Sequence, residues 1–402
     1  MAAAFLQFLA TVWIARTLGE ERSGDFFFWS AILMSFGHVA TFGLDGLALQ
    51  QVPRLDGNRV AHAHFLGVVR TIAITFSAFV GAVLIGYALL AQKEISRSLL
   101  WYCMLPIGIG GMAMCRVNGE SMKGGGYPLL AILYRQFVAG FIFLLAIVVL
   151  GKGLTAGNAL VCYSVAFFVT GFLAPFGPGF SKLGLPFHIP EAKEVVEKLR
   201  AGVPIFSSTI FTALTYVIPL AVLESMFPAE SVSFLTTAYR LFMLFDLLAA
   251  AIHSVAMPRL SRSGHAKDWA LTAQIYRGSI VNGLKVLGVP LVLVLLFASP
   301  VMRLFGPGFA EAAPILQTFL AFTVVSLVLG PANELVLMMG HTKRMAMFSM
   351  VRTVTTILLS FAFIPVFGPL GMALAVGVGL LLQKGLCLGH FFRNSRNSGN
   401  AA

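Results

Sequence analysis

Residues 127–150 read YPLLAILYRQFVAGFIFLLAIVVL, an apolar run that contains a single charged residue, Arg135. A helix needs about 20 predominantly apolar residues to cross the hydrocarbon core of a bilayer, so this run predicts a membrane-spanning helix. Eleven further stretches support the same prediction: 2–18, 25–50, 65–91, 98–118, 154–176, 202–226, 232–257, 276–302, 312–338, 345–367 and 370–392. We therefore predict an all-α polytopic membrane protein with about 12 transmembrane helices.

The composition of the 402-residue chain agrees, because 58% of its residues are hydrophobic and only 11% are charged. Soluble proteins carry about 25% charged residues. Twelve spans of about 20 residues would leave roughly 160 residues for all connections, too few for a soluble domain between spans. A cytosolic enzyme, a disordered chain and a disulfide-stapled secreted protein are therefore excluded.

The basic residues predict the orientation. With the N-terminus inside, 16 of the 28 lysines and arginines fall in cytoplasmic segments, six fall on the opposite side and six fall inside helices. Cytoplasmic loops of membrane proteins carry an excess of Lys and Arg. We therefore predict cytoplasmic N- and C-termini, and we attribute the net charge of +12 to this bias and not to a nucleic-acid partner.

Motifs for chemistry are missing from the sequence. It contains no GxxxxGK[ST] phosphate loop, no HExxH and no CxxC pair. Cys103, Cys115, Cys162 and Cys387 lie in apolar stretches and are expected to be small buried side chains. His62 and His64 form an HxH in a predicted cytoplasmic loop, where solvent exposure is more common than metal binding. We expect a secondary transporter without catalytic residues, metal or cofactor, and not an enzyme.

The longest polar stretch, Lys182 to Arg200, divides the chain nearly in half. Glu194 and Lys198 have the i,i+4 spacing that supports a helix, so the stretch predicts an amphipathic cytoplasmic connector. We expect three parts: an N-terminal six-helix lobe over 1–178, the connector over 179–200, and a C-terminal six-helix lobe with a short basic tail over 201–402.

A weak internal repeat supports two lobes. QVPRL at 51–55 follows the second span, and AMPRL at 256–260 follows the eighth span, which is the second of its half. Because six spans lie in each half, both halves would run in the same direction. This predicts a parallel pseudo-two-fold repeat, one of the architectures of secondary transporters.

Charged residues inside spans are costly and usually line a cavity. Three acids are clearly inside spans, Asp45, Asp246 and Glu334, and Glu224 lies at a span end. Six bases are inside spans: Arg70, Arg135, Arg240, Lys285, Arg352 and Lys384. None of the first five of these has an acid three or four residues away on its own helix. The excess of positive charge favours an anionic ligand.

Snorkelling to the headgroups is the alternative for the bases in the cytoplasmic halves of their spans, and for these both interpretations stay open. Arg240 differs, because it lies about 13 Å from the outer end of its span, near mid-membrane, which favours a cavity role.

Prolines inside spans bend or break helices and often mark moving or site-lining segments. Five fall at such positions: Pro106, Pro204, Pro219, Pro290 and Pro331. The glycines near them are explained equally well by close packing of helices.

Several short motifs resemble the polysaccharide-type flippases of the MOP (multidrug/oligosaccharidyl-lipid/polysaccharide) superfamily. They are WIARTLGE at 13–20 with Gly24 and Phe26, AYRL at 238–241, PRLS at 258–261, LFGPGF at 304–309 and GPAN at 330–333. Family members usually have a cytoplasmic tail before the first span. Because this chain starts almost inside its first span, we expect a late start or an incomplete first helix.

The resemblance implies an O-antigen (Wzx-like) flippase of lipopolysaccharide biosynthesis in the bacterial inner membrane. Such proteins move polyprenyl-diphosphate-linked oligosaccharides from the cytoplasmic to the periplasmic leaflet by alternating access. Their two six-helix lobes have a MATE-like arrangement in which spans one, two, seven and eight border a central cavity. The expected partners are the lipid-linked oligosaccharide, membrane lipid, a polysaccharide polymerase and glycosyltransferases.

The expected site residues fall into two sets. The cavity cations that would bind substrate are Arg240, Arg16, Lys285, Arg135, Arg352 and Arg70. The acids that would couple a proton or a sodium ion are Asp45, Asp246, Glu224 and Glu334. A cation-coupled multidrug antiporter of the same superfamily and a non-transport scramblase or assembly protein are the alternatives. The sequence leaves the sugar, the coupling ion and the oligomeric state open.

Overall fold

The computed structural model describes residues 2–55, 58–90, 99–127, 130–131, 133–173, 188, 190–266 and 268–399. All regular structure in these residues is helical. Nine of the described helices are long and apolar enough to cross a membrane, or ten if the bent pair Leu6–Val39 and Leu44–Gln51 counts as one span. The predicted class, an all-α polytopic membrane protein, is confirmed.

The chain forms two compact units, Met1–Ala213 and Leu214–Ala402. The helices of the first unit are α1 (Ala2–Val39), α2 (Leu44–Gln51), α3 (Arg59–Leu90), α4 (Leu99–Gly124), α6 (Ala139–Leu150), α7 (Ala156–Leu173) and the first part of α8 (Ala192–Met226). The helices of the second unit are α9 (Ala229–Ser254), α10 (Met257–His265), α11 (Trp269–Leu296), α12 (Ala298–Met302), α13 (Ala313–Leu329), α14 (Ala332–Met338), α15 (Thr342–Phe367) and α16 (Pro369–Gly399).

The first two predicted spans both lie within α1 and α2. At Gly19 the backbone leaves the helical conformation, with φ 76° and ψ −177°, values that glycine adopts without steric cost. The helix therefore breaks where the sequence predicts the loop between spans 2–18 and 25–50. A second bend follows at Phe42 and Gly43, both with positive φ, before α2 begins.

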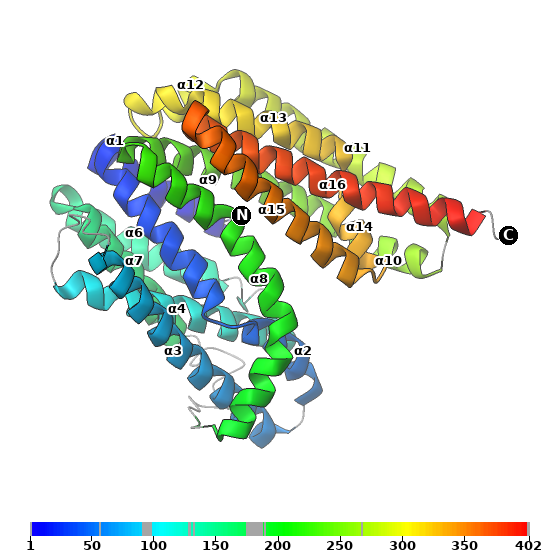
Figure 1. The fold of residues 1–402 in the computed structure, drawn as a ribbon, viewed down its shortest axis with the longest axis horizontal. Helices are drawn as coiled ribbons and strands as arrows, with labels where there is room; N and C mark the ends of the chain where they lie inside the picture. The colour runs from blue at the N-terminus through cyan, green and yellow to red at the C-terminus, as the bar shows by residue number, and fades with distance from the viewer. Residues whose placement is uncertain are drawn as a thin grey trace. The chain divides into compact units, whose positions relative to one another are not determined.

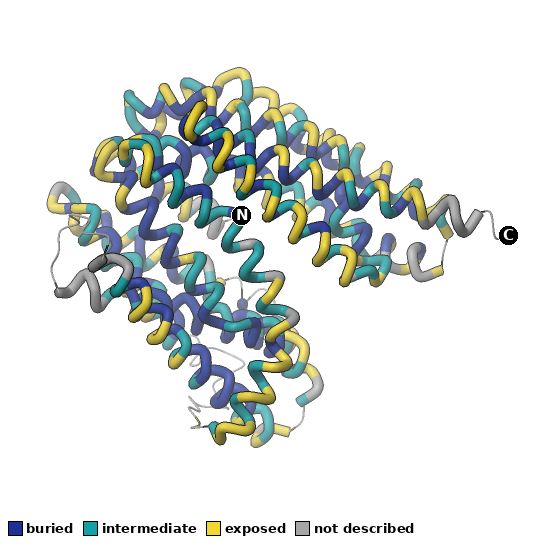
Figure 2. The backbone as a smooth tube through the Cα atoms, viewed as in Figure 1, coloured by how far each residue is buried: buried dark blue, intermediate teal, exposed yellow. Residues whose placement is uncertain are grey.

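Each unit is organised around one helix. In the first unit α4 packs against α1, α2, α3 and α7, and in the second α16 packs against α9, α13, α14 and α15. Figure 1 shows α15 and α16 running side by side. Figure 2 shows buried residues concentrated on the helix faces that meet. Large apolar side chains on outer faces, such as Phe141 on α6, Val289 on α11 and Leu358 on α15, are exposed, as expected for helices in lipid.

The described end of the predicted connector is the start of α8. Residues 179–187 and 189 lie outside the described residues, and the predicted division of the chain at 178 and 200 stays a prediction. Glu194, in the first turn of α8, accepts a hydrogen bond from the backbone N–H of Glu191 through Oε2 at 3.3 Å. A hydrogen bond from His64 holds the pKa of the Glu194 carboxyl below its usual value. α8 begins at Ala192, so the part of the connector that holds Glu194 and Lys198 is helical, as their spacing predicts, and it continues into the seventh predicted span.

His62 and His64 were expected in a loop, but they lie in the first turns of α3, which begins at Arg59. This expectation was wrong because the apolar pattern starts later than the helix itself.

The repeated motif falls at matching places, since Val52–Leu55 forms a short helix after α2 and Met257–His265 forms α10 after α9.

Candidate functional site

One predicted site residue, Asp45, belongs to an ion pair in the first unit. Asp45, on α2, is only 3% exposed. Its Oδ2 accepts hydrogen bonds from Arg116 on α4, from Nη2 at 2.7 Å and from Nε at 3.0 Å. Thr41 donates to Oδ1 at 3.0 Å. Both oxygens of the Asp45 carboxylate are therefore engaged by protein donors.

A second group of charged side chains lies on α4, where the carboxylate of Glu120 forms ion pairs with two basic residues. Arg135 donates from Nη1 to Glu120 Oε1 at 2.8 Å, and Lys123 donates to the same oxygen at 2.7 Å. Arg135 belongs to a π-helical turn, Leu133–Val138, a feature that appears frequently at functional sites. The carboxylate partner of Arg135 comes from another helix, so the sequence spacing along its own helix did not predict the pair.

Arg70 is buried inside the first unit, with 0% exposure. Its Nε donates to Asn118 Oδ1 on α4 at 2.9 Å, and Asn118 Nδ2 donates to the carbonyl of Gly171 on α7 at 2.9 Å. A snorkelling side chain reaches the aqueous boundary, whereas this one does not. Arg70 therefore joins α3, α4 and α7 through a polar network.

The second unit contains a cavity of about 110 Å³ between its own helices. The cavity brings together three predicted site residues, Asp246 on α9, Glu334 on α14 and Arg352 on α15. Two further residues of its lining are Lys384 of α16, a second cation, and His253 of α9. The remaining lining residues are Phe245, Ala249, Ala250, Leu287, Leu291, Thr323, Ser326, Leu327, Asn333 and Leu380. Two carboxylates and two cations thus share one small space.

Lys384 is fixed by a broken helix in the cavity wall. α13 ends at Leu329, Gly330 takes φ 69° and ψ −161°, and α14 begins after Pro331. The ammonium of Lys384 donates to the carbonyls of Ser326 at 2.8 Å and Gly330 at 2.9 Å. Tyr276 of α11 donates its hydroxyl hydrogen to the Leu329 carbonyl. Breaks inside membrane helices persist where other groups satisfy the freed backbone, and these side chains do so here.

Two other polar groups of the cavity, Arg352 and His253, also have described partners. Arg352 donates from Nη1 to Gln383 Oε1 at 3.2 Å, and Gln383 Nε2 donates to Ser349 at 2.9 Å. His253 Nδ1 lies 2.9 Å from the hydroxyl of Ser279. The network orients the guanidinium of Arg352 in the wall of the cavity.

The remaining predicted site residues are more scattered. Arg16 and Lys285 are exposed, on α1 and α11, and Glu224 is half-buried near the end of α8. Arg240 is half-buried at the middle of α9. Six residues separate Arg240 from Asp246, a net rotation of about 240° around the helix, so the two project in different directions.

Four polar residues of these groups were missed as site residues: Arg116, Glu120, His253 and Lys384. Arg116 lies near the cytoplasmic end of the predicted span 98–118, where the bias towards Lys and Arg already accounts for a basic residue. Lys384 was recognised as a charge inside a span, which was the signal available for it. The partners of Arg116 and Lys384 are 71 and 54–58 residues away in sequence, and no local pattern encodes such pairs.

Comparisons with known proteins agree with the fold. The family described as polysaccharide biosynthesis protein matches residues 1–263. No curated protein matches the chain. An inward-facing multidrug resistance MATE family transporter of the MOP superfamily is 15% identical, with a TM-score of 0.79 over 100% of this chain and 97% of that one.

Two more solved structures are similar. The lipid II flippase MurJ, in an inward closed conformation, is 15% identical, with a TM-score of 0.77 over 98% of this chain and 88% of that one. A MOP superfamily transporter from Pyrococcus furiosus is 15% identical, with a TM-score of 0.63 over 98% and 93% of the two chains. At this level of identity these structures establish the fold.

Proposed function

Because this chain belongs to the polysaccharide biosynthesis protein family, we propose that it is a flippase for polyprenyl-diphosphate-linked oligosaccharide. The family match over residues 1–263 carries the proposal, together with the fold of MOP superfamily transporters. In this proposal the substrate moves from the cytoplasmic to the periplasmic leaflet of the bacterial inner membrane by alternating access. The sugar would be an O-antigen repeat unit destined for lipopolysaccharide.

The chemistry of the substrate supports the proposal. A diphosphate is a dianionic group that the planar fork of an arginine can bind through two parallel hydrogen bonds. Arg240 has the position that such a contact requires, since it is half-buried at the middle of a 26-residue helix. We therefore assign the first diphosphate contact to Arg240.

The proposed cycle separates the two ends of the substrate. The anionic headgroup and its sugars enter an inward-open cavity, while the prenyl tail stays in the hydrocarbon. Because the tail is never exposed to water, its movement between leaflets carries no hydrophobic cost. Rocking of one repeat against the other then exposes the cavity to the opposite side. Binding energy at the diphosphate offsets the cost of removing its charge from water.

The test is transport by an Arg240→Ala variant. Hydrogen bonds to charged groups contribute about 1.5–3 kcal/mol, so we expect flipping in proteoliposomes to fall by about tenfold or more, and cells to accumulate unflipped lipid-linked oligosaccharide. Arg240→Lys should retain part of the activity. Arg277→Ala, which removes an exposed guanidinium from α11, is the matched control. Wild-type flipping by Arg240→Ala at normal membrane insertion would remove Arg240 from the site.

A cation-coupled multidrug antiporter of the same superfamily is the second candidate. It is favoured by Asp246 and Glu334, which both line the cavity of the second unit. Arg352 and Lys384 line the same cavity and would repel a cationic drug, so we rank this function second. Drug efflux from cells expressing the chain separates the two, since only the antiporter would lower drug accumulation.

A further inference from the structure

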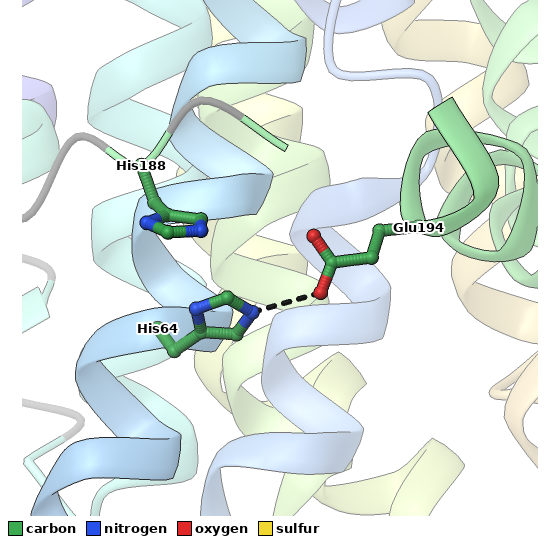
Figure 3. A group of neighbouring side chains, drawn as sticks. All are labelled: His64, His188 and Glu194. Atoms are coloured by element: carbon green, nitrogen blue, oxygen red, sulfur yellow. Dashed lines mark hydrogen bonds and ion pairs between the residues drawn. The ribbon is translucent and has the colours of Figure 1, made fainter. Parts of the chain in front are cut away.

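Two histidines and a glutamate meet where α8 begins (Figure 3). His64 is in the second turn of α3, His188 is in the segment before α8, and Glu194 is in the first turn of α8. Each residue offers one ligand atom, and the three atoms all lie within 4.8 Å of one another. The two imidazole rings are 4.3 Å apart between centroids. All three groups belong to the first unit.

The carboxylate of Glu194 is oriented from both sides. Its Oε1 lies 2.8 Å from His64 Nε2, and its Oε2 accepts the backbone N–H of Glu191 at 3.3 Å. The second contact is the return half of a capping box, in which a glutamate in the first turn binds back to the start of the helix. One oxygen is therefore anchored by the helix start while the other points at the imidazoles. Anchoring of this kind is typical of metal-ligating carboxylates.

Apolar packing holds the two backbones in place without help from the polar groups. Val195 and Leu199 of α8 pack against a buried cluster of the first unit that contains Phe65 and Leu66 of α3. Phe65 directly follows His64 in sequence, and Val195 directly follows Glu194. The Lys198 ammonium also lies over the Phe65 ring, 5.8 Å from its centroid. Packing therefore fixes the backbone positions of His64 and Glu194.

We propose that His64, His188 and Glu194 form a zinc-binding site that fastens the chain before α8 to α3. Two imidazole nitrogens and one carboxylate oxygen are a common zinc ligand set, with water in the fourth position. Zinc–ligand distances of about 2.0–2.2 Å place the donor atoms of a tetrahedral site about 3.3 Å apart. The observed separations run from 2.8 Å to at most 4.8 Å, so side-chain rotations are enough to close the site.

A hydrogen bond between His64 and Glu194 accounts for only part of this cluster. That contact needs one imidazole, yet His188 is brought into ring contact with His64 as well. Both histidines are exposed, so no burial of apolar surface explains why they meet. Zinc coordination explains all three positions together. The site does not depend on the proposed transport function.

The experiment is zinc titration by calorimetry of the purified, untagged full-length protein in detergent, after removal of metals with EDTA. We expect one zinc ion per chain. His188→Ala and Glu194→Gln should each weaken binding by at least about 100-fold, the upper end of the cost of losing an outer-shell partner. His62→Ala is the matched control, because it removes a neighbouring histidine on α3 and should leave the affinity unchanged.

A second readout uses Co²⁺ as the probe. Wild-type protein should give the intense visible absorption of tetrahedral Co²⁺, and His188→Ala should lose it while keeping the wild-type gel-filtration profile. Three results would overturn the site: no saturable zinc binding, equal affinity in wild type and His188→Ala, or loss of binding in His62→Ala alone. The last result would assign the metal to the HxH pair. Because every readout is metal binding, failure here leaves the flippase proposal untouched.

Discussion

Asp45 and Arg116 form a buried ion pair between α2 and α4, in which a single carboxylate oxygen accepts from both Nη2 and Nε. The side chain of Asp45 is 5% exposed and that of Arg116 is 22% exposed. Removal of one partner from such a pair leaves a charge without compensation in a poorly solvated place. The pair therefore ties the end of the second predicted span to α4.

Asp45→Asn should lower the stability of the protein. We expect a loss of about 2 kcal/mol, below the 3–5 kcal/mol of fully buried pairs because Arg116 retains some contact with solvent. Thermal unfolding of the two proteins in detergent measures this loss of stability. The double variant Asp45→Asn/Arg116→Gln should recover part of the loss, since the uncompensated charge is then absent. An unchanged midpoint for Asp45→Asn would show that the pair adds nothing to stability.

Lys384→Met should destabilise the second unit through the broken helix. Without the ammonium, the carbonyls of Ser326 and Gly330 lose their donor, and an unsatisfied buried polar group costs about 1–3 kcal/mol. We expect a loss of about 2–4 kcal/mol for Lys384→Met and a smaller loss for Lys384→Arg. Lys343→Met, an exposed position on α15, is the control. Equal midpoints for Lys384→Met and Lys343→Met would refute the structural role.

Gly19→Ala tests the break in α1. A Cβ at Gly19 would meet nothing within 4 Å, so any cost comes from the backbone conformation alone. Its φ and ψ lie in a region adopted almost only by glycine, and a substituted residue there costs about 1–3 kcal/mol. Gly86→Ala is matched, because its Cβ also meets nothing but its helical backbone suits alanine. We expect Gly19→Ala to have a lower melting temperature than wild type, and Gly86→Ala not to have a lowered melting temperature.

Glu334→Gln tests ion coupling at the cavity of the second unit. We expect wild-type flipping in proteoliposomes to respond to an imposed sodium or proton gradient, because the carboxylates of Asp246 and Glu334 both line this cavity and a proton or a sodium ion, unlike a bulky cationic drug, can bind to them without displacing Arg352 or Lys384. Removal of one carboxylate charge should abolish the response. Glu311→Gln, at an exposed position, should retain it. A response that persists in Glu334→Gln and Asp246→Asn would place coupling elsewhere.

Hydropathy predicted the helices because membrane insertion is decided by runs of residues adjacent in the chain. The break after residue 18 and the discontinuity at Pro331 were also visible locally, in glycine and proline. The ion pairs of Arg116 with Asp45 and of Arg135 with Glu120 could not be predicted from the local sequence, because each pair joins two different helices. Lys384 shows the limit most clearly. Its charge marked it as unusual, but only the packed unit shows that it binds the backbone of a neighbouring helix.

The same lysine determines how the second unit can deform. Rotation about Gly330 would first have to remove two hydrogen bonds from Lys384 and one from Tyr276. Because these side chains come from α16 and α11, α13 cannot swing independently of either. The break at Gly330 is therefore held rigid by these hydrogen bonds and does not act as a hinge. We expect α11, α13 and α16 to move together as one rigid body.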